Sequence, residues 1–302
     1  MVGGEGSFSA VASNQYFSES KGNVVQPFLD FTQVFINVAN GQSDYGIVPI
    51  ENNVSGTMFE VYSLLLTHPT VHITGEIALN HEYCLLVLPG VKQEDIRQII
   101  SHARILQQCS QFLATFSSPD IAVVQRIVPN TIAACELLVT HDLKDGAVIA
   151  SFQAGQRFNL QVLVRNISIP QEVVTRYFVI AMAPAHVLHL TSSLKCSIAV
   201  TISNLTGAFF KTTACFALRD VNISKFECAP APPCRLKPSN PFKQAFTWEY
   251  IFFIDFEPPS PSVSQLIIKH LEEYALSVKQ FGLYQPQPYS SEGFKLDWTA
   301  FI

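Results

Sequence analysis

The order of strand-like and helix-like segments changes near residue 184, and this change limits the folds that the chain can adopt. Before that point, short apolar runs alternate with segments whose apolar residues recur at helical spacing. The strands predicted there are 45–50, 81–88, 121–124, 147–151 and 173–183, and the helices are 8–17, 58–65 and 102–113, the last with Ser101 as its N-cap. Alternation of this kind predicts an α/β domain with mostly parallel sheets flanked by helices.

The rest of the chain follows a different order. From residue 196 the sequence predicts strand, helix, strand, strand, helix and strand, at 196–202, 207–218, 222–228, 248–256, 263–279 and 281–284. This β-α-β-β-α-β order is that of the ferredoxin-like fold. We therefore expect a first domain at 1–185, a linker at 186–195, a second domain at 196–284 and an irregular tail at 285–302.

Length and composition exclude several classes of partner. At 302 residues, of which 48% are hydrophobic, the chain can bury more than one core. A net charge of -5, without a run of Lys or Arg, argues against a nucleic-acid partner. No apolar stretch reaches the roughly 20 residues of a membrane span, so no membrane partner is expected.

Cysteine, histidine and the start of the chain bear on metals and on the compartment. The seven Cys form no Cys-x-x-Cys pair and the eight His show no metal-ligand spacing, so we expect no metal site. Scattered Cys in odd number are typical of a reducing compartment. The start, MVGGEGSFSA, lacks the basic and apolar segments of a secretory signal, so we expect a cytoplasmic protein.

The first candidate site is the small-residue loop 4–9, GEGSFS, which opens a predicted helix. Free backbone N–H groups at a helix start favour a carboxylate or phosphate, and a hydroxyl such as that of Ser7 adds a hydrogen bond. The alternative is that Gly and Ser form only a turn and a cap.

The second candidate is the segment 49–57, PIENNVSGT, in which an apolar strand ends in polar residues. Ligands of open α/β sheets bind outside the carboxyl ends of the strands, so a pocket is expected at this segment. The alternative is an ordinary loop closed by an Asn side chain, with Ser55 as the N-cap of the next helix.

The third candidate is Thr175-Arg176, a polar pair inside an apolar strand. Burial of a guanidinium is costly unless a carboxylate compensates its charge. That carboxylate can belong to an anionic substrate or to an Asp or Glu of the protein, and the sequence leaves both alternatives open.

Taken together, these segments resemble the prephenate/arogenate dehydratase family along nearly the whole chain. The matching motifs are, in order, GEGSFS, DYGIVPIENNVSGT, SHARILQQCSQFL, GAVIASFQAGQRF, VTRYF and, in a region similar to the family's ACT domain, GAFFKTTACFALRDVNISKFE and WEYIFFIDFE. The resemblance implies a two-lobed catalytic domain like a type II periplasmic binding protein, with the substrate between the lobes. Lobe 1 would comprise about 1–78 and 162–185, lobe 2 about 80–160, and the ACT domain 196–284.

The resemblance also implies a reaction that needs no cofactor. A carbon–oxygen lyase of this family expels carbon dioxide and water, and so converts prephenate to phenylpyruvate or arogenate to phenylalanine. By resemblance, Thr175 is the hydrogen-bond donor to the departing hydroxyl and Arg176 anchors a substrate carboxylate. The remaining cleft would be lined by Ser7, Asn52, Ser55, Gly56 and Thr57.

The similarity to an ACT domain implies amino-acid sensing and assembly. A phenylalanine site would involve Asn204, Gly207, Ala208 and Glu227. Because Ala229 stands where the family has Arg, we expect phenylalanine to be a weak effector, unless Arg235 or Lys237 substitutes for the missing side chain. Pairing of ACT domains implies a homodimer or homotetramer.

Several positions depart from the family's pattern. They are Asn130 in place of an Asp, Ile169 in place of an acidic residue, Val173 in place of an Asn and Tyr177 in place of a Phe. The strand that normally precedes the first Gly loop is reduced to residues 1–3, which leaves a plastid location open if the N-terminus is truncated. The alternative function is therefore a non-catalytic binding or regulatory relative that keeps the cleft and the sensing domain.

Overall fold

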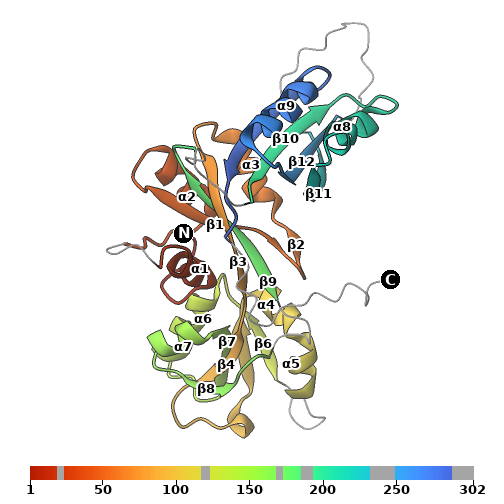
Figure 1. The fold of residues 1–302 in the computed structure, drawn as a ribbon. Coiled ribbons are helices and arrows are strands. Elements are labelled where there is room, and N and C mark those ends of the chain that lie inside the picture. The colour runs from red at the N-terminus through yellow and green to blue at the C-terminus, as the bar shows by residue number, and fades with distance from the viewer. Residues whose placement is uncertain (19–23, 117–122, 168–172, 185–192, 232–248, 288–302) are drawn as a thin grey trace, which may run out of the picture.

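The computed structural model describes residues 1–18, 24–116, 123–167, 173–184, 193–231 and 249–287. Their strands form three sheets, and each sheet with its helices makes one part of an elongated molecule: lobe 2, lobe 1 and a ferredoxin-like unit, from the bottom to the top of Figure 1. None of the described helices is long and apolar enough to cross a membrane. The linker predicted at 186–195 and the tail predicted at 285–302 fall mostly outside the described residues.

Lobe 1 contains the strands β1 (Tyr45–Asn52), β2 (Gly56–Thr57), β3 (His72–Asn80) and β9 (Val174–Ala181), and the helices α1 (Phe8–Tyr16), α2 (Phe31–Ala39) and α3 (Phe59–Thr67). Its sheet has the order β2-β1-β9-β3. Helices α2 and α3 cover one face, with core residues such as Phe35 and Leu65, and α1 covers the other with Ala12. Because side chains alternate along a strand, β9 directs Phe178 to the first face and Tyr177 to the second.

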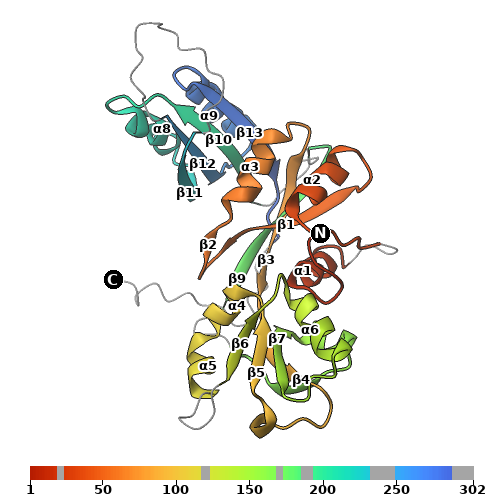
Figure 2. The same ribbon diagram turned by 180° about the vertical axis from the view of Figure 1, so that it is seen from behind.

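Lobe 2 contains β4 (Tyr83–Val87), β5 (Gln98–Ser101), β6 (Val124–Ile127), β7 (Gly146–Ser151), β8 (Gln161–Val164), α4 (Ala103–Gln108), α5 (Ser110–Phe116), α6 (Thr131–Thr140), α7 (Phe152–Arg157) and the 3-10 turn η1 (Gln93–Asp95). Its sheet has the order β6-β5-β7-β4-β8. Helices α4 and α5 pack on one face against Leu85, and α6 and α7 pack on the other against Leu86 (Figure 2). The predicted N-cap Ser101 instead ends β5, and His102 caps α4.

The chain crosses between the two lobes twice. Strand β3 continues through His81 and Glu82 into β4, and the segment after β8 returns to lobe 1 as β9. The crossing segments are hydrogen-bonded to each other, from His81 N to Val173 O at 2.7 Å and from Ile167 N to Tyr83 O at 3.1 Å. His81 therefore lies in the hinge between the lobes.

The two-lobed α/β architecture is confirmed, but the expectation of mostly parallel sheets is wrong. Among the described residues, every strand pair of lobe 1 is antiparallel. In lobe 2, β5 runs parallel to β6 and β7, whereas β4 runs antiparallel to β7 and β8. The reason is that β4 and β9 arrive directly from the other lobe, so a strand–helix–strand crossover does not set their direction.

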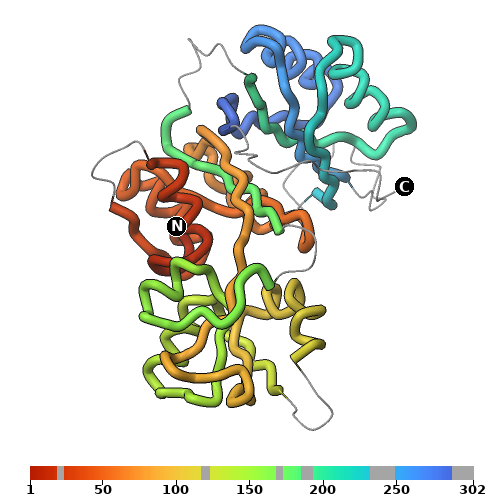
Figure 3. The backbone as a smooth tube through the Cα atoms, turned by 60° about the horizontal axis from the view of Figure 1, so that its bottom comes forward, coloured from red at the N-terminus to blue at the C-terminus, as the bar shows by residue number. Residues whose placement is uncertain are grey.

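The ferredoxin-like unit contains β10 (Lys195–Ile202), α8 (Ala208–Ala217), β11 (Asn222–Pro230), β12 (Tyr250–Glu257), α9 (Pro261–Glu272) and β13 (Ser277–Tyr284). Its antiparallel sheet has the order β11-β12-β10-β13, which confirms the ferredoxin-like arrangement. Helices α8 and α9 cover one face of this sheet. The other face packs on lobe 1, where Phe253 and Phe281 join one core cluster with Tyr62 and Ile73. Lobe 1 thus lies between lobe 2 and the ferredoxin-like unit (Figure 3).

Candidate active site

Thr175 and Asn52 form the centre of the candidate site. They are paired across β9 and β1, and the Nδ2 group of Asn52 donates a hydrogen bond to Oγ1 of Thr175 at 2.8 Å. Both side chains are buried, with 2% of Thr175 and 5% of Asn52 exposed. The structure therefore brings the predicted catalytic residue and one predicted cleft residue into direct contact.

The loop after β1 is organised by the side-chain oxygen of Asn52. This Oδ1 accepts hydrogen bonds from the backbone N–H groups of Val54 and Ser55, both at 2.9 Å, and from the Ser55 hydroxyl at 3.2 Å. Gly56 follows with a φ of 75°, in the left-handed region that favours glycine. The loop closed by an Asn side chain is thus confirmed, but Ser55 is not an N-cap, because Met58 occupies that position before α3.

Lobe 2 contributes one further hydrogen bond to Asn52, and a series of hydrogen bonds continues from it to Tyr83 and His81. The Nε2 group of Gln108, at the end of α4, donates to Asn52 Oδ1 at 3.2 Å. The Tyr83 hydroxyl donates to Oε1 of Gln108 at 2.6 Å and lies 3.0 Å from Nδ1 of His81. The other ring nitrogen of His81 lies 3.4 Å from the Tyr177 hydroxyl. Burial lowers the pKa of His81 to about 3, so this imidazole is neutral at physiological pH.

The Gly loop lies against both lobes. Ser7 caps α1 by accepting a hydrogen bond from Ala10 N at 3.2 Å, so the turn-and-cap alternative describes its structural role. The Gly6 carbonyl accepts a hydrogen bond from the Ser151 hydroxyl of lobe 2 at 2.5 Å. Phe8, the first residue of α1, stacks on the His81 ring with centroids 4.0 Å apart.

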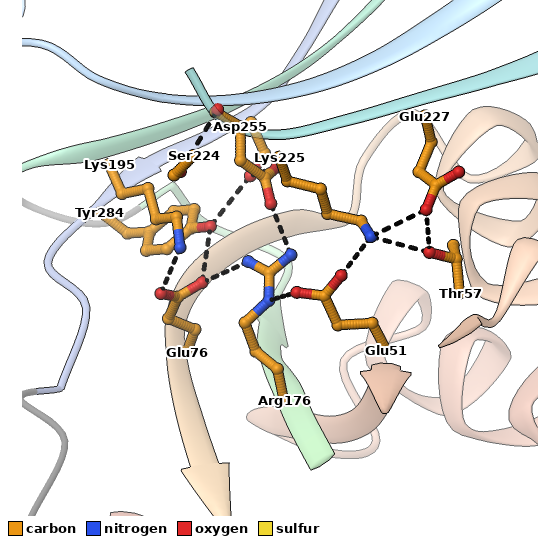
Figure 4. A network of polar contacts seen from close by, with 11 residues as sticks. Glu51, Thr57, Glu76, Arg176, Lys195, Ser224, Lys225, Glu227, Asp255 and Tyr284 are labelled. Carbon is orange, nitrogen blue, oxygen red and sulfur yellow. Dashed lines mark hydrogen bonds and ion pairs between the residues drawn. The ribbon is translucent and has the colours of Figure 1, made fainter. Parts of the chain in front are cut away.

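Arg176 lies on the opposite side of β9 from Thr175, as neighbouring residues of a strand must. Figure 4 shows its guanidinium among the carboxylates of Glu51, Glu76 and Asp255. Its guanidinium donates to Glu51 and Glu76 at 2.7 Å each and to Asp255 at 2.6 Å. Only 11% of the Arg176 side chain is exposed. Burial by itself lowers the pKa of Arg176, but the three carboxylates outweigh burial and hold it well above the usual value.

The same cluster joins lobe 1 to the ferredoxin-like unit. Lys195 binds Glu76 at 2.7 Å, and Ser197 donates to Asp255 at 2.6 Å. Lys225 binds Glu51 on one side and Glu227 on the other. We call this set the Arg176 cluster, and it consists of Glu51, Thr57, Glu76, Arg176, Lys195, Ser197, Lys225, Glu227, Asp255 and Tyr284.

The first 185 residues decide the family. They match the family model described as "Prephenate dehydratase". The chain belongs to the prephenate dehydratase family. It is 33% identical over 260 residues to arogenate dehydratase/prephenate dehydratase 2 of Arabidopsis thaliana, a chloroplastic protein, with 85% of this chain and 65% of that protein covered. The alignment thus spans slightly less than two thirds of the relative.

Solved structures share the fold of the prephenate dehydratase family. The prephenate dehydratase of Arthrobacter aurescens in complex with L-Phe superposes with a TM-score of 0.79 at 23% identity, covering 94% of this chain and 88% of that one. GqqA, described as a novel type of quorum quenching acylase, gives a TM-score of 0.78 at 22% identity, covering 95% of this chain and 97% of the GqqA chain. At these identities the likeness concerns the fold.

In this structure, Arg176, Thr57 and Glu227 have partners within the protein. The Arg176 guanidinium donates to three protein carboxylates, so the ion-pair alternative describes its contacts in this structure. Thr57 does not join Thr175; its hydroxyl donates to Glu227 in the Arg176 cluster. Glu227 in turn faces lobe 1, whereas its neighbour Phe226 packs on the opposite, helix-covered side.

The other residues predicted to sense phenylalanine lie elsewhere in the ferredoxin-like unit. Gly207, with a φ of 77°, is the N-cap of α8, and Ala208 begins that helix. Asn204 is exposed in the preceding turn. The start of α8 packs beside β11, where Phe209 contacts Phe226, the neighbour of Glu227, and Arg235 and Lys237 lie outside the described residues. Among the described residues, no group of His, Cys, Asp or Glu could hold a metal ion.

Phe8, His81, Tyr83 and Gln108 were not among the site residues predicted from the sequence. Gln108 lies within the motif SHARILQQCSQFL, so its place in that segment was the available signal. The apolar run 81–88 predicts only a buried strand, and no local pattern shows that Tyr83 reaches a helix 25 residues away. The Tyr83–Gln108 contact depends on how α4 packs on the sheet of lobe 2, and the contact of Gln108 with Asn52 depends on how the two lobes meet.

Proposed function

We propose that the chain is a dehydratase of phenylalanine biosynthesis that acts on prephenate or arogenate. In this carbon–oxygen lyase reaction the ring carboxylate leaves as carbon dioxide and its bonding electron pair moves into the ring. The ring carbon–oxygen bond then breaks, and the departing hydroxyl takes up one proton to leave as water. Aromatisation drives the reaction, so the chain's residues need only bind, orient and donate a hydrogen bond.

The position of the Thr175 hydroxyl carries this proposal. It lies near the start of β9, where the chain has just returned to lobe 1, and Asn52, which also contacts Gln108 of lobe 2, already donates to its oxygen. Its own hydrogen is thus available to the departing hydroxyl of a bound substrate. A buried hydroxyl is too weak an acid to hold an excess proton, so we assign it the role of a positioned donor.

We propose an indirect role for Arg176. Its contacts hold β9, and hence the neighbouring Thr175, against β12 of the ferredoxin-like unit. The backbone N–H groups of the Gly loop, with Ser7, and the loop residues Ser55 and Gly56 remain the proposed contacts of the substrate.

The test is to incubate the purified protein with prephenate and with arogenate while following phenylpyruvate and phenylalanine. Formation of either product, lost in Thr175→Ala and retained in part by Thr175→Ser, is the expected result. If neither product forms although one of the compounds binds in calorimetry, the chain is the non-catalytic binding relative instead.

Regulation, assembly and location extend the proposal. The L-Phe complex of the Arthrobacter aurescens enzyme supports phenylalanine as an effector, and the replacement of an Arg by Ala229 supports a weak effect. We further propose a homodimer or homotetramer formed through the ferredoxin-like units, measurable by light scattering. The chloroplastic location of the Arabidopsis relative supports the plastid alternative to the cytoplasm.

A further inference from the structure

We propose that His81 and Tyr83 are positioning residues, which orient the amide of Gln108 so that the hydrogen-bond chain ending at Thr175 leaves the proton of that hydroxyl free for the substrate. This inference rests on the proposed dehydratase function for its catalytic consequence. The geometry itself does not depend on that function.

The direction of the chain is set first at Asn52. Two backbone N–H groups, those of Val54 and Ser55, point at one side-chain atom of Asn52 at 2.9 Å each. Backbone N–H groups only donate, so this atom is the amide oxygen and the NH2 group faces Thr175. The Thr175 oxygen is therefore an acceptor in this contact.

The orientation of Gln108 follows from that of Asn52. Since Asn52 Oδ1 is an acceptor, the atom of Gln108 that lies 3.2 Å away is the NH2 group. The Gln108 oxygen then faces Tyr83 at 2.6 Å, so the Tyr83 hydroxyl must donate its single proton there. A flipped Gln108 would place two oxygens against each other.

The tautomer of His81 is the next consequence. Because the single hydroxyl proton of Tyr83 is donated in the hydrogen bond to Gln108, the Tyr83 oxygen can only accept a hydrogen bond from Nδ1 of His81, 3.0 Å away. The ring is neutral, since its burial lowers the pKa of His81 to about 3, so Nε2 carries no proton and accepts from the Tyr177 hydroxyl. Phe8, stacked on the ring, keeps it in this plane.

The hydrogen bonds thus all point in one direction, and the series starts in lobe 1, passes through the hinge and lobe 2, and returns to lobe 1 at Asn52 and Thr175. Among the described residues, Thr175 Oγ1 makes the single hydrogen bond that it accepts from Asn52. Its own proton is the last of the series and has no acceptor within the chain of contacts. Without Tyr83, the buried oxygen of Gln108 loses its partner and the amide is no longer held toward Asn52.

The kinetic test compares two Tyr→Phe variants. Tyr83→Phe removes the donor to Gln108, whereas Tyr62→Phe removes a hydroxyl that is equally buried but has no hydrogen-bond partner among the described residues. On the substrate that the wild type converts, Tyr83→Phe is expected to lower kcat about tenfold, the effect of one buried neutral hydrogen bond, and to leave KM within about twofold. Tyr62→Phe is expected to leave kcat unchanged. Equal kcat values for the two variants would overturn the proposal.

A second measurement does not require turnover. Nitrogen NMR of the wild-type imidazole rings shows which ring nitrogen of His81 is protonated. The His81 signals are identified by their absence from the spectrum of His81→Gln. A proton on Nδ1, the less favoured position in free histidine, supports the proposed direction of the hydrogen bonds. A proton on Nε2 refutes it. If Tyr83→Phe does not fold, or if neither compound is converted, this tautomer decides the proposal alone, and absent turnover counts only against the dehydratase function.

Discussion

Replacing Arg176 by Met is the sharpest test of the structural role of the Arg176 cluster. The guanidinium donates to Glu51, Glu76 and Asp255 at 2.6–2.7 Å and is nearly buried. Met fills a similar volume but compensates no charge. The substitution therefore leaves three carboxylates that face one another without the cation between them.

The charges of the cluster give the expected magnitude. The wild-type cluster has three cations, Arg176, Lys195 and Lys225, and four anions, so its net charge is one negative; in the variant it is two negative. Removing one partner from a buried ion pair costs about 3–5 kcal/mol. We expect a loss of this size in the free energy of unfolding, or a fall in Tm of about 10 °C.

The assay is urea denaturation followed by circular dichroism, with Arg176→Lys and Arg165→Met for comparison. Arg176→Lys keeps the positive charge but loses the planar set of guanidinium donors, so its free energy of unfolding should lie between those of the wild type and Arg176→Met. Arg165 makes an exposed ion pair with Glu82 at 3.8 Å, so its loss should cost less than about 1 kcal/mol. An Arg176→Met protein as stable as Arg165→Met would refute the reasoning.

The remaining predictions concern the donor, the hinge histidine and the effector. Thr175→Ala is expected to lower kcat by about two powers of ten or more with little change in KM, and Thr175→Ser to recover part of it; unchanged turnover in steady-state assays would exclude Thr175 as the donor. Since burial lowers the pKa of His81 to about 3, the unfolded chain binds a proton that the folded chain excludes between that pH and about 6.5. The free energy of unfolding should therefore fall on acidification through this window by up to about 1.4 kcal/mol per pH unit, and His81→Asn should remove that part of the slope in urea titrations; equal slopes would contradict it. Calorimetric titration with phenylalanine should show weak or no binding because Ala229 offers no side-chain donor, whereas tight binding with strong inhibition would point to Arg235 or Lys237.

Local sequence patterns were sufficient for many single elements. The apolar runs at 45–50 and 173–183 correspond to β1 and β9, and the order of the last six elements was predicted correctly. Strand β3 was missed because its sequence, HITGEIALN, breaks the apolar pattern with Gly75 and Glu76. Both residues are explained by contacts with other elements. The side chain of Tyr16 lies where a side chain of Gly75 would be, and Glu76 binds Arg176.

What the sequence by itself determined is the family and the α/β class, because these depend on motifs and on short-range periodicity. The resemblance implied one site for Thr175 and Asn52, but their direct hydrogen bond joins residues 123 apart and comes from the tertiary structure. Only the tertiary structure decided strand direction, the use of Arg176 and the set of side chains around Asn52. Because side chains alternate along a strand, Thr175 and Arg176 must face opposite sides of β9, but the alternation does not determine which residues they contact there. That depends on Asp255, 79 residues away, and on Gln108, 56 residues from Asn52, which meet their partners only when the lobes and the ferredoxin-like unit have packed together.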